Sequence, residues 1–392
     1  MLRRLVLFFA LAFTAVGCSQ FGSLNAIPKS TANVRSLTSP KDDGFKTIFE
    51  FHVSDGSDPV AALTAQQGVL YGTTYRGGAY GYGTLFSLTT SGKEKVLHSF
   101  SQDGVAPAAR LLILNGIFYG TTSGGGRNRY GSVFAIKTSG KQLWSYAFKG
   151  GADGIDPQGG LMVQSGNLFG ATWSGGNQHD GSVYKITPSH AEIQLHAFVG
   201  NHDGANPDGE LLRVGHLFYG TTSAGGGVYP ADYGTVFSVT PSGQEKILHA
   251  FADNYQDGIE PLAGLTAMNG ALYGTTQWGG KYENGTVFSI TTAGKERVVY
   301  SFGKNATDGT NPEAPVVAQN GNLFGTTAWG GANGKGTVFE VTVSGKERVL
   351  HSFDWYDGTS PVSGLIALNG LLYGTTDSGG TYSVGTIFAL KP

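Results

Sequence analysis

The sequence predicts an all-β protein, and within that class a seven-bladed β-propeller of four-stranded blades. Three observations carry this prediction. Glycine is abundant, at 63 of 392 residues, whereas charged residues make up only 14% and aromatic residues 12%. Short apolar runs alternate with turn residues along most of the chain, and no run has helical length and period. The same pattern recurs seven times at intervals of about 50 residues, which suits a propeller blade.

The N-terminal segment has the layout of an export signal. Residues 1–4 are a short start that contains the two basic residues Arg3 and Arg4, and residues 5–16 form an apolar run that is too short to cross a bilayer comfortably. Residues 15–18 resemble a bacterial lipobox, in which the cysteine becomes the lipidated first residue of the mature protein. A plain signal peptide followed by an unrelated cysteine is the alternative. Because Cys18 is the only cysteine, an exported chain would have no intrachain disulfide.

We therefore divide the chain into a lipoprotein signal peptide at 1–17, a lipidated flexible tether at 18–45 and the propeller at 46–392. The tether is rich in Ser and Thr and has no periodicity, so it would reach roughly 30 Å as a random coil. This division predicts an exported protein of the bacterial cell envelope or outer surface, with the membrane as a partner through the lipid anchor. A formal charge of −2 argues against nucleic-acid binding, and we expect a monomer.

Each repeat centres on a Tyr/Phe-Gly-Thr/Ala-Thr core. In the fifth repeat we expect four strands, named A to D from the inner edge outward, at 265–268, 271–276, 286–291 and 297–302. The last repeat has no D strand after its C strand, so we expect residues 46–51 to supply it and close the ring. The core glycines are Gly72, Gly120, Gly170, Gly220, Gly274, Gly325 and Gly374.

Variation in length is confined to two connections of the repeat. Each repeat contains an Asp-Gly-x-x-Pro motif, and its proline, the motif proline, lies 13 residues before the core glycine in every repeat. The glycine just before strand C lies 17 residues before the phenylalanine at the end of strand D wherever both occur in sequence. Only the B–C and D–A connections vary. In an antiparallel blade both lie on one face, which we call the variable face. The A–B and C–D turns form the opposite, uniform face. Loops on a rigid scaffold commonly carry binding sites, so we expect a ligand on the variable face and the tether on the uniform face.

Aromatic and arginine side chains gather in the variable loops. Exposed aromatic rings beside arginine suit the recognition of sugar rings or peptides. Packing of the tryptophans between blades is the alternative. The candidate ligand-binding residues are Trp173, Trp278, Trp329, Arg76, Arg129, Tyr229 and Tyr233.

Two further sets of repeated residues are better explained by structure. An aspartate opens an Asp-Gly-x-x-Pro motif in each repeat, which favours a turn that bonds its own backbone over a calcium or catalytic site. Histidines in strand D alternate with Tyr and Phe, which favours packing or a local hydrogen bond over metal binding. No phosphate-binding loop, nucleophile elbow or His-Glu-x-x-His motif occurs. The sequence thus predicts no catalytic residue, no cofactor and no metal. The histidines are His98, His196, His249 and His351.

Four motifs together suggest a family. They are Leu-Tyr-Gly-Thr-Thr at 272–276, Gly-Gly at 279–280, Gly-Thr-Val-Phe at 285–288 and Asp-Gly-x-x-Pro at 257–261. With their counterparts over 46–392 the chain resembles the bacterial GloVer tandem-repeat proteins, which have a choice of surface anchors. The resemblance implies an exported, surface-attached repeat protein with Cys18 as its anchor, and implies no activity. Ala171 in the third core departs from the pattern.

We expect a non-enzymatic surface protein that binds a glycan or another protein on its variable face. The alternative is a propeller enzyme, such as a polysaccharide lyase or hydrolase, with its reactive groups confined to one or two blades near the central channel. A purely structural module of a surface assembly is a third possibility. The residues that would serve the enzyme alternative are Arg110, Glu210, Glu313, His179, Asp180, His202 and Asp203.

Overall fold

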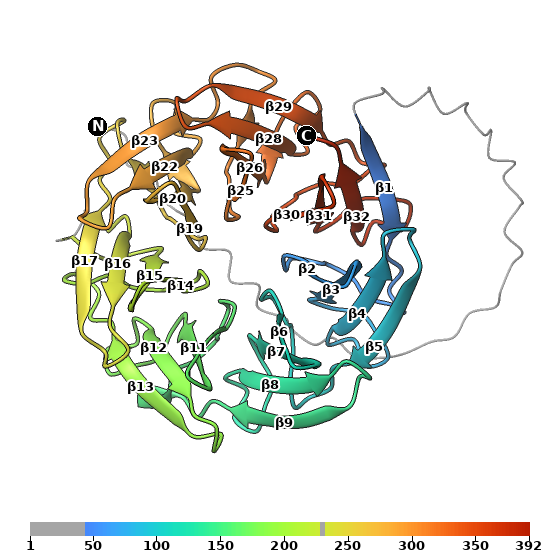
Figure 1. Ribbon diagram of the computed structural model, residues 1–392, viewed down its shortest axis with the longest axis vertical. Helices are drawn as coiled ribbons and strands as arrows, with labels where there is room; N and C mark the ends of the chain where they lie inside the picture. Colours follow the sequence, from blue (N-terminus) through green and yellow to red (C-terminus); the bar gives the residue numbers. More distant parts are fainter. Residues whose placement is uncertain (1–43, 228–231) are drawn as a thin grey trace, which may run out of the picture. The chain divides into compact units, whose positions relative to one another are not determined.

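A computed structural model of the chain describes residues 44–227 and 232–392. These residues form seven four-stranded antiparallel sheets arranged in a ring, which confirms the predicted seven-bladed β-propeller (Figure 1). The predictions for the signal peptide, for residues 18–43 of the tether, for Cys18 and for Tyr229 fall outside the described residues. The predicted end of the tether at residue 45 is wrong, because Phe45 is the first residue of strand β1. The described part of the chain contains one 3-10 turn, Gly151–Asp153, and no helix there is long and apolar enough to cross a membrane.

The strands are short and recur in the same order in every blade. The three-residue inner strands, A, are β2 (Thr64–Gln66), β6 (Leu112–Leu114), β10 (Met162–Gln164), β14 (Leu212–Val214), β19 (Thr266–Met268), β25 (Val317–Gln319) and β30 (Ile366–Leu368). The B strands, which carry the core glycines, are β3 (Val69–Thr74), β7 (Ile117–Thr122), β11 (Asn167–Thr172), β15 (Leu217–Thr222), β20 (Ala271–Thr276), β26 (Asn322–Thr327) and β31 (Leu371–Thr376).

The outer half of each blade is built from two strands of five or six residues each. The C strands are β4 (Thr84–Thr89), β8 (Ser132–Lys137), β12 (Ser182–Ile186), β16 (Thr235–Val239), β22 (Thr286–Ile290), β28 (Thr337–Thr342) and β32 (Thr386–Leu390). The outermost strands, D, are β5 (Glu94–Ser99), β9 (Gln142–Ala147), β13 (Glu192–Ala197), β17 (Glu245–Ala250), β23 (Glu296–Ser301), β29 (Glu347–Ser352) and β1 (Phe45–Glu50). Two short ribbons pair β18 (Gly258–Ile259) with β21 (Trp278–Gly279) and β24 (Gly309–Thr310) with β27 (Trp329–Gly330).

An aromatic ring on strand C packs so closely on strand B that the core position there must be glycine. In the fifth blade a Cβ atom on Gly274 would stand 2.5 Å from Cζ of Phe288, so only glycine leaves room for the ring. The strand-D phenylalanine of each blade then packs on the strand-C ring of the next blade, as Phe251 does on Phe288 with ring centroids 5.2 Å apart. The core therefore lies between blades as well as within them, and it contains the large buried side chains.

The two residues after the core glycine bind neighbouring segments. The first threonine donates its hydroxyl to a backbone carbonyl of the next blade, as Thr275 does to Ala314 at 2.9 Å. The second pairs with a hydroxyl at the start of strand C, as Thr276 does with Thr286 at 2.8 Å. In the third blade Ala171 stands in the first position and has no hydroxyl to donate. The Gly-Thr-Thr motif is thus a packing and hydrogen-bonding unit of the fold.

The residue before each motif proline fixes the start of strand A. It has a positive φ of 53–60° in all seven blades, although it is never glycine. Its amide and carbonyl bond to two different blades. The Asp156 amide donates to the Tyr130 carbonyl of the preceding blade at 2.9 Å, and the Asp156 carbonyl accepts from the Trp173 amide at 2.9 Å. The loops of the variable face are therefore joined to one another by backbone hydrogen bonds.

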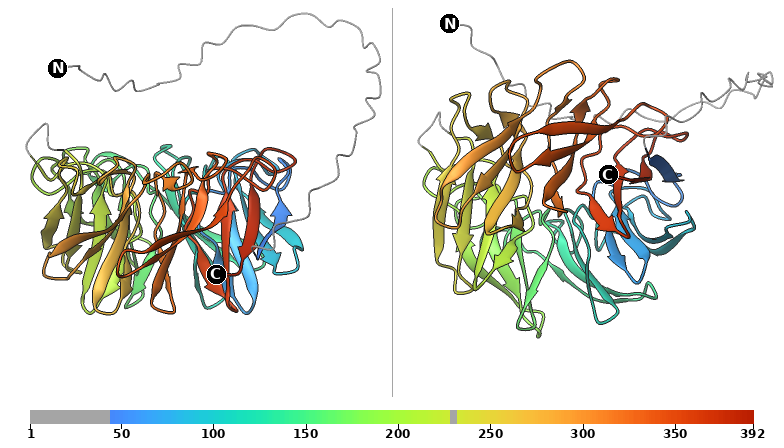
Figure 2. Two further views of the ribbon diagram at one scale, coloured as in Figure 1. Left: turned by 90° about the horizontal axis from the view of Figure 1, so that it is seen from above. Right: turned by 45° about the horizontal axis from the view of Figure 1, so that its top comes forward.

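The N-terminal strand closes the ring as predicted, one residue earlier than expected. β1 pairs antiparallel with β32, with Phe45 opposite Leu390 and Glu50 opposite Thr386. The Thr375 hydroxyl donates to the Pro59 carbonyl at 2.6 Å and so joins the last blade to the first. Because Phe45 lies opposite the end of strand C, β1 begins on the uniform face. In the left view of Figure 2 the B–C and D–A loops gather on the upper side and the hairpin turns on the lower side.

Candidate functional site

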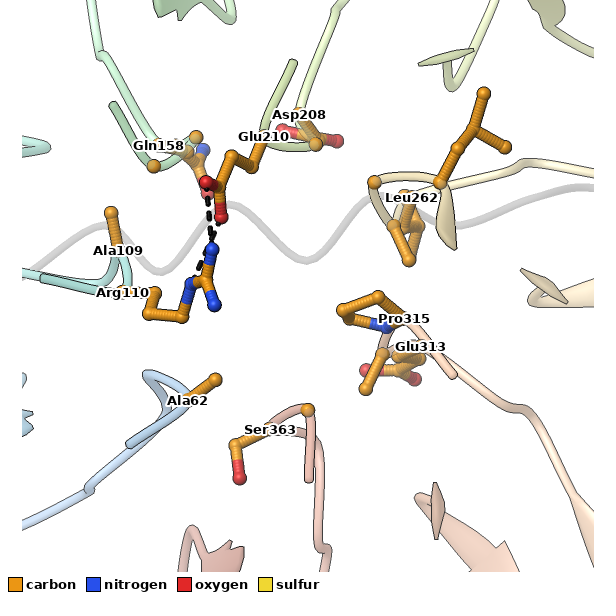
Figure 3. Close-up of a pocket in the computed structure, with 18 of the residues that line it drawn as sticks. Ala62, Ala109, Arg110, Gln158, Asp208, Glu210, Leu262, Glu313, Pro315 and Ser363 are labelled. Atoms are coloured by element: carbon orange, nitrogen blue, oxygen red, sulfur yellow. Dashed lines mark hydrogen bonds and ion pairs between the residues drawn. The ribbon is translucent and has the colours of Figure 1, made fainter. Parts of the chain in front are cut away.

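The central channel holds a cavity of about 630 Å³. All seven blades line it, each through the residues that follow the motif proline and lead into strand A (Figure 3). Strand A begins directly after the D–A connection, so the cavity lies at the end of the channel that opens on the variable face. The volume is within the range of about 300–1,000 Å³ that is typical of small-molecule sites.

The polar lining of this cavity breaks the symmetry of the repeat. Directly after the motif proline stand Gln158, Asp208 and Glu313, in blades 3, 4 and 6. Two residues later stand Arg110 in blade 2 and Glu210 in blade 4. The fold does not need polar groups at these positions, because other blades carry apolar or small residues there. Those residues are Val60, Ala62, Ala108, Gly160, Leu262, Gly264, Pro315, Val362 and Gly364.

An ion pair spans two blades at the cavity wall. The Arg110 guanidinium donates from Nη2 to Glu210 Oε1 at 2.9 Å and from Nε to Glu210 Oε2 at 3.1 Å, a two-point contact visible in Figure 3. The negative charge of Glu210 raises the pKa of Arg110. Both residues also line a second cavity of about 230 Å³ beside strands β2 and β6. Each charge of the pair is thus already compensated by the other.

Two other carboxyl groups near the cavity lack such compensation. Burial, together with the charge of Asp156, raises the pKa of Asp208 to about 7. Burial also raises the pKa of Asp156, whose Oδ2 accepts from Gln158 Nε2 at 3.1 Å. The Oδ1 atoms of both aspartates are buried and have no hydrogen-bond partner among the described residues. A group that brings a donor or a positive charge would stabilise these two oxygens.

Trp173 is the predicted ligand residue that reaches the cavity. It lines the wall and is 38% exposed. Its carbonyl accepts from Asn206 Nδ2 of the next blade at 2.9 Å, and its amide donates to Asp156. The loop that carries the indole is therefore held by hydrogen bonds to its own blade and to its neighbour.

The other two predicted tryptophans lie elsewhere on the variable loops. Trp278 and Trp329 belong to the short ribbons β21 and β27, are 43% and 51% exposed, and do not line the cavity. All three tryptophans are therefore exposed to solvent and are not buried between blades. Alternating residues of an extended segment face opposite sides, and these two stand one position later after the core glycine than Trp173 does.

The remaining predicted ligand residues do not converge on the cavity. Arg76 Nη1 forms an ion pair with Asp58 Oδ2 at 3.0 Å. Arg129 is exposed in the second B–C loop, with a φ of 65°. Tyr233 is half-buried and packs against an inter-blade core cluster. None of the three lines the cavity.

Of the residues proposed for the enzyme alternative, Arg110, Glu210 and Glu313 line the cavity, whereas the two His-Asp loop pairs do not. Glu313 Oε1 accepts from Gln277 Nε2 at 2.7 Å, and burial raises the pKa of this carboxyl. The sequence analysis missed Asp156, Gln158 and Asp208. A comparison of the position after the motif proline across the repeats would have found Gln158 and Asp208, because polar residues occur there in only three blades. It would not have found Asp156, because the position before the proline is polar in six of the seven repeats.

Histidine and acidic residues form clusters at the outer edges of two blades. His196, Asp203 and Glu245 offer ligand atoms within 4.8 Å of one another, and His249, Asp257 and Glu296 repeat this arrangement. In each cluster the histidine Nε2 and the aspartate lie 2.9 Å apart. Such groups could hold a metal ion.

Tyrosine takes the place of histidine in other blades and makes the same bond. The Tyr300 hydroxyl donates to Asp308 at 2.8 Å and the Tyr146 hydroxyl to Asp153 at 2.5 Å. The outer clusters are therefore versions of one contact of the repeat, and the local hydrogen bond predicted for the strand-D histidines is confirmed for His196, His249 and His351. His98 differs, because its Nδ1 lies 3.2 Å from the Gly140 carbonyl.

Comparisons with known proteins agree with this architecture. A comparison with curated proteins finds no match. One solved structure that the chain resembles is a candidate 6-phosphogluconolactonase from Bacteroides uniformis, with 14% sequence identity over 75% of this chain and 84% of that chain, and a TM-score of 0.49. At that score the likeness carries no argument for this protein. The model of the Gloeobacter/Verrucomicrobia repeat matches residues 33–231 and 227–392. The chain therefore belongs to the Gloeobacter/Verrucomicrobia repeat family.

Proposed function

We propose that this protein is a non-enzymatic binding protein that takes an oligosaccharide into the mouth of its central channel, on the variable face. The observation that carries the proposal is the cavity of about 630 Å³ in which the exposed Trp173 lies among carboxylate, amide and guanidinium groups. We further propose that the protein is exported and held at the bacterial cell envelope by a lipid on Cys18. That part rests on the lipobox-like sequence alone.

The chemistry of the cavity suits a sugar. A pyranose ring presents an apolar C–H face and a rim of hydroxyl groups. An indole packs against the apolar face, because it combines a large apolar area with a polar edge. Charged side chains such as Asp208 and Arg110 make stronger hydrogen bonds to hydroxyls than neutral groups do. A concave site with one aromatic wall and a few polar groups can therefore both hold and orient a saccharide.

The same geometry favours binding over hydrolysis. A glycosidase needs one carboxylic acid as a proton donor and a second carboxylate as base or nucleophile. Glu210 has both oxygens engaged by Arg110, and Glu313 Oε1 accepts a hydrogen bond from Gln277 of the neighbouring blade. Asp208 and Asp156 remain as a neighbouring pair of carboxyl groups, but Asp156 does not line the cavity. The enzyme alternative is kept as an outcome of the experiment.

A glycan array with the purified protein tests the binding proposal. Trp173→Ala should weaken the affinity for the bound glycan about tenfold, because an aromatic contact is worth roughly 1.5 kcal/mol. The matched control is Trp355→Ala, since Trp355 is 47% exposed but does not line the cavity. Equal affinities of the two variants would contradict the proposed site. Chromatography of the incubated glycan would detect cleavage. Cleavage would show that the protein is an enzyme and contradict the proposal of a non-enzymatic binding protein.

Fractionation of expressing bacteria tests the anchoring proposal. Cys18→Ser should move the protein from the membrane fraction to a soluble fraction and abolish the incorporation of labelled fatty acid. Cys18→Ser changes one atom of the side chain, so altered folding is not the expected cause. A variant that stays in the membrane fraction would contradict the lipid anchor and favour the plain signal peptide.

A further inference from the structure

We infer that the ligand of the central cavity carries a protonated amine, as an oligosaccharide with free amino groups does, and that this ammonium group binds at Asp208 beside Asp156. The inference rests on the proposed binding function and names the class of its ligand. It draws on charge, hydrogen bonding and the comparison of repeats.

The charge balance of the cavity is negative. Among the described residues that line it, Arg110 is the only cationic side chain, and Glu210 neutralises its charge in the two-point ion pair. Asp208 and Glu313 then remain as lining carboxyls without a basic partner, and Asp156 lies close enough to Asp208 to raise its pKa. A negatively charged ligand would meet repulsion here, whereas a cation would be attracted.

Two carboxylate oxygens lack a donor. The Oδ1 atoms of Asp156 and Asp208 are buried without a hydrogen-bond partner among the described residues. Atoms buried in this way do not touch a ligand themselves, but they show that the protein supplies no donor to offset the charge of these two carboxyl groups. Asp208 lines the cavity, and an ammonium group bound there would supply a positive charge and up to three donors.

The wall beside these oxygens also favours a cation. The face of an indole attracts a positive charge through the quadrupole of the ring. Trp173 lines the same cavity as Asp208, and its amide bonds the Asp156 carbonyl at 2.9 Å. The aromatic wall and the two carboxyl groups therefore come from adjacent blades, and a main-chain hydrogen bond joins Trp173 to Asp156.

The repeat provides an internal control for the role of Asp208. The same position is Val60 in blade 1, Leu262 in blade 5 and Val362 in blade 7, and these blades have the same strands and the same proline. The fold therefore accepts an apolar side chain where Asp208 stands. A half-buried carboxyl with a raised pKa costs stability, so its presence is better explained by a ligand than by the scaffold.

Calorimetry with two glucosamine tetramers tests the inference. One tetramer has free amines and the other is fully N-acetylated, so they match in length and differ in charge. In a buffer at about pH 7 the free amines are partly protonated, and Asp208, whose pKa is about 7, is partly ionised. Because a bound ammonium group favours the ionised carboxylate, we expect the free amine form to bind roughly 10- to 100-fold more tightly. Asp208→Asn should remove that advantage and leave the affinity for the acetylated form unchanged. Asp253→Asn is the matched control, because Asp253 is an exposed aspartate that does not line the cavity.

The outcomes separate this inference from the proposed function. If the acetylated tetramer binds as tightly as the free amine, and Trp173→Ala weakens both, the cavity is a sugar site but the amine inference is wrong. If neither tetramer binds, the amine inference is wrong, and the glycan array decides the proposed function separately. Tight binding of Ca²⁺ that is lost in Asp208→Asn would assign the two aspartates to a metal and overturn the inference. Melting temperatures of the variants show whether any loss reflects unfolding.

Discussion

Ala171 is the position at which one side chain departs from the hydrogen-bonding scheme that joins the blades. The first residue after the core glycine donates a hydroxyl to the next blade wherever it is threonine, as Thr121 does to the Gly159 carbonyl at 3.2 Å. We predict that Ala171→Thr raises the free energy of unfolding by about 1 kcal/mol, because it adds one such bond in a buried position. The measurement is chemical denaturation with a common m-value.

The matched control for this change is Ala171→Val, which adds the same branched shape without a hydroxyl. If Val stabilises the protein as much as Thr does, the gain comes from packing and the hydrogen-bond explanation fails. If both variants are less stable than the native chain, the third blade has no room for a branched side chain beside Tyr184, which replaces the phenylalanine of the other blades.

At the residue scale, some residues of the candidate site could be identified from the sequence. Arg110, Glu210 and Glu313 could be selected because they are charged residues in segments where other repeats are apolar. Asp208 could have been selected in the same way. Asp156 could not be separated from ordinary turn residues, since the residue before the motif proline is polar in six of the seven repeats. Only the closed ring brings side chains about 50 positions apart to one cavity, and only there does their lack of partners become visible.

The outer strands carry a repeated acidic contact that makes stability depend on pH. Five of the D strands begin with a glutamate whose Oε1 atom is buried and has no hydrogen-bond partner among the described residues. Burial, together with a nearby aspartate of the preceding blade, raises the pKa of four of them to about 7 and of Glu192 to about 8. These residues are Glu94, Glu192, Glu245, Glu296 and Glu347.

The direction of the pH effect follows from where the protons are bound. Between a pH of about 4.5 and the raised pKa values, the folded protein keeps protons on these glutamates that the unfolded chain has released. The free energy of unfolding therefore falls as pH rises through this range. We predict a higher melting temperature at about pH 5 than at about pH 8, which is the opposite of the usual trend for carboxylates paired with bases.

A single variant tests whether the strand-D glutamates cause this pH dependence of stability. Glu245→Gln should reduce the pH dependence, because an amide has no proton to lose, and the fold accepts it since Gln142 holds this position in the second blade. Glu283→Gln, at an exposed loop position, is the matched control. A melting temperature that rises with pH in the native protein, or a Glu245→Gln profile identical to that of the control, would contradict the account.

At the scale of the whole molecule, the fold was largely predictable because every repeat contains the same pattern of strands and turns. Constant spacings of 13 and 17 residues fix the strands, and seven copies fix the number of blades. The Trp residues show the limit of this approach. Trp173 and Trp278 stand in equivalent loops, yet the cavity includes only the first, because a shift of one residue in an extended segment turns the side chain to another side. Such orientation depends on the closed ring and not on composition.

Closure by β1 is the feature on which the whole ring depends. β1 covers the edge of β32, and Phe49 and Ile48 pack against a core cluster that joins the first and last blades. We predict that a chain beginning at His52 is less stable and self-associates, because the unpaired edge of β32 offers free backbone groups to a second molecule. Light scattering and thermal melting measure both effects.

A chain beginning at Gly44 is the matched control, because it keeps β1 and is expected to remain a monomer with the melting temperature of the full protein. Adding a synthetic peptide of residues 44–52 to the shortened chain should restore the monomer, since the peptide can pair with β32 in the register of β1. A shortened chain that stays monomeric and melts at the same temperature would contradict closure by β1. In that case the contacts between blades, of which the Thr375–Pro59 hydrogen bond is one, would suffice to hold the ring.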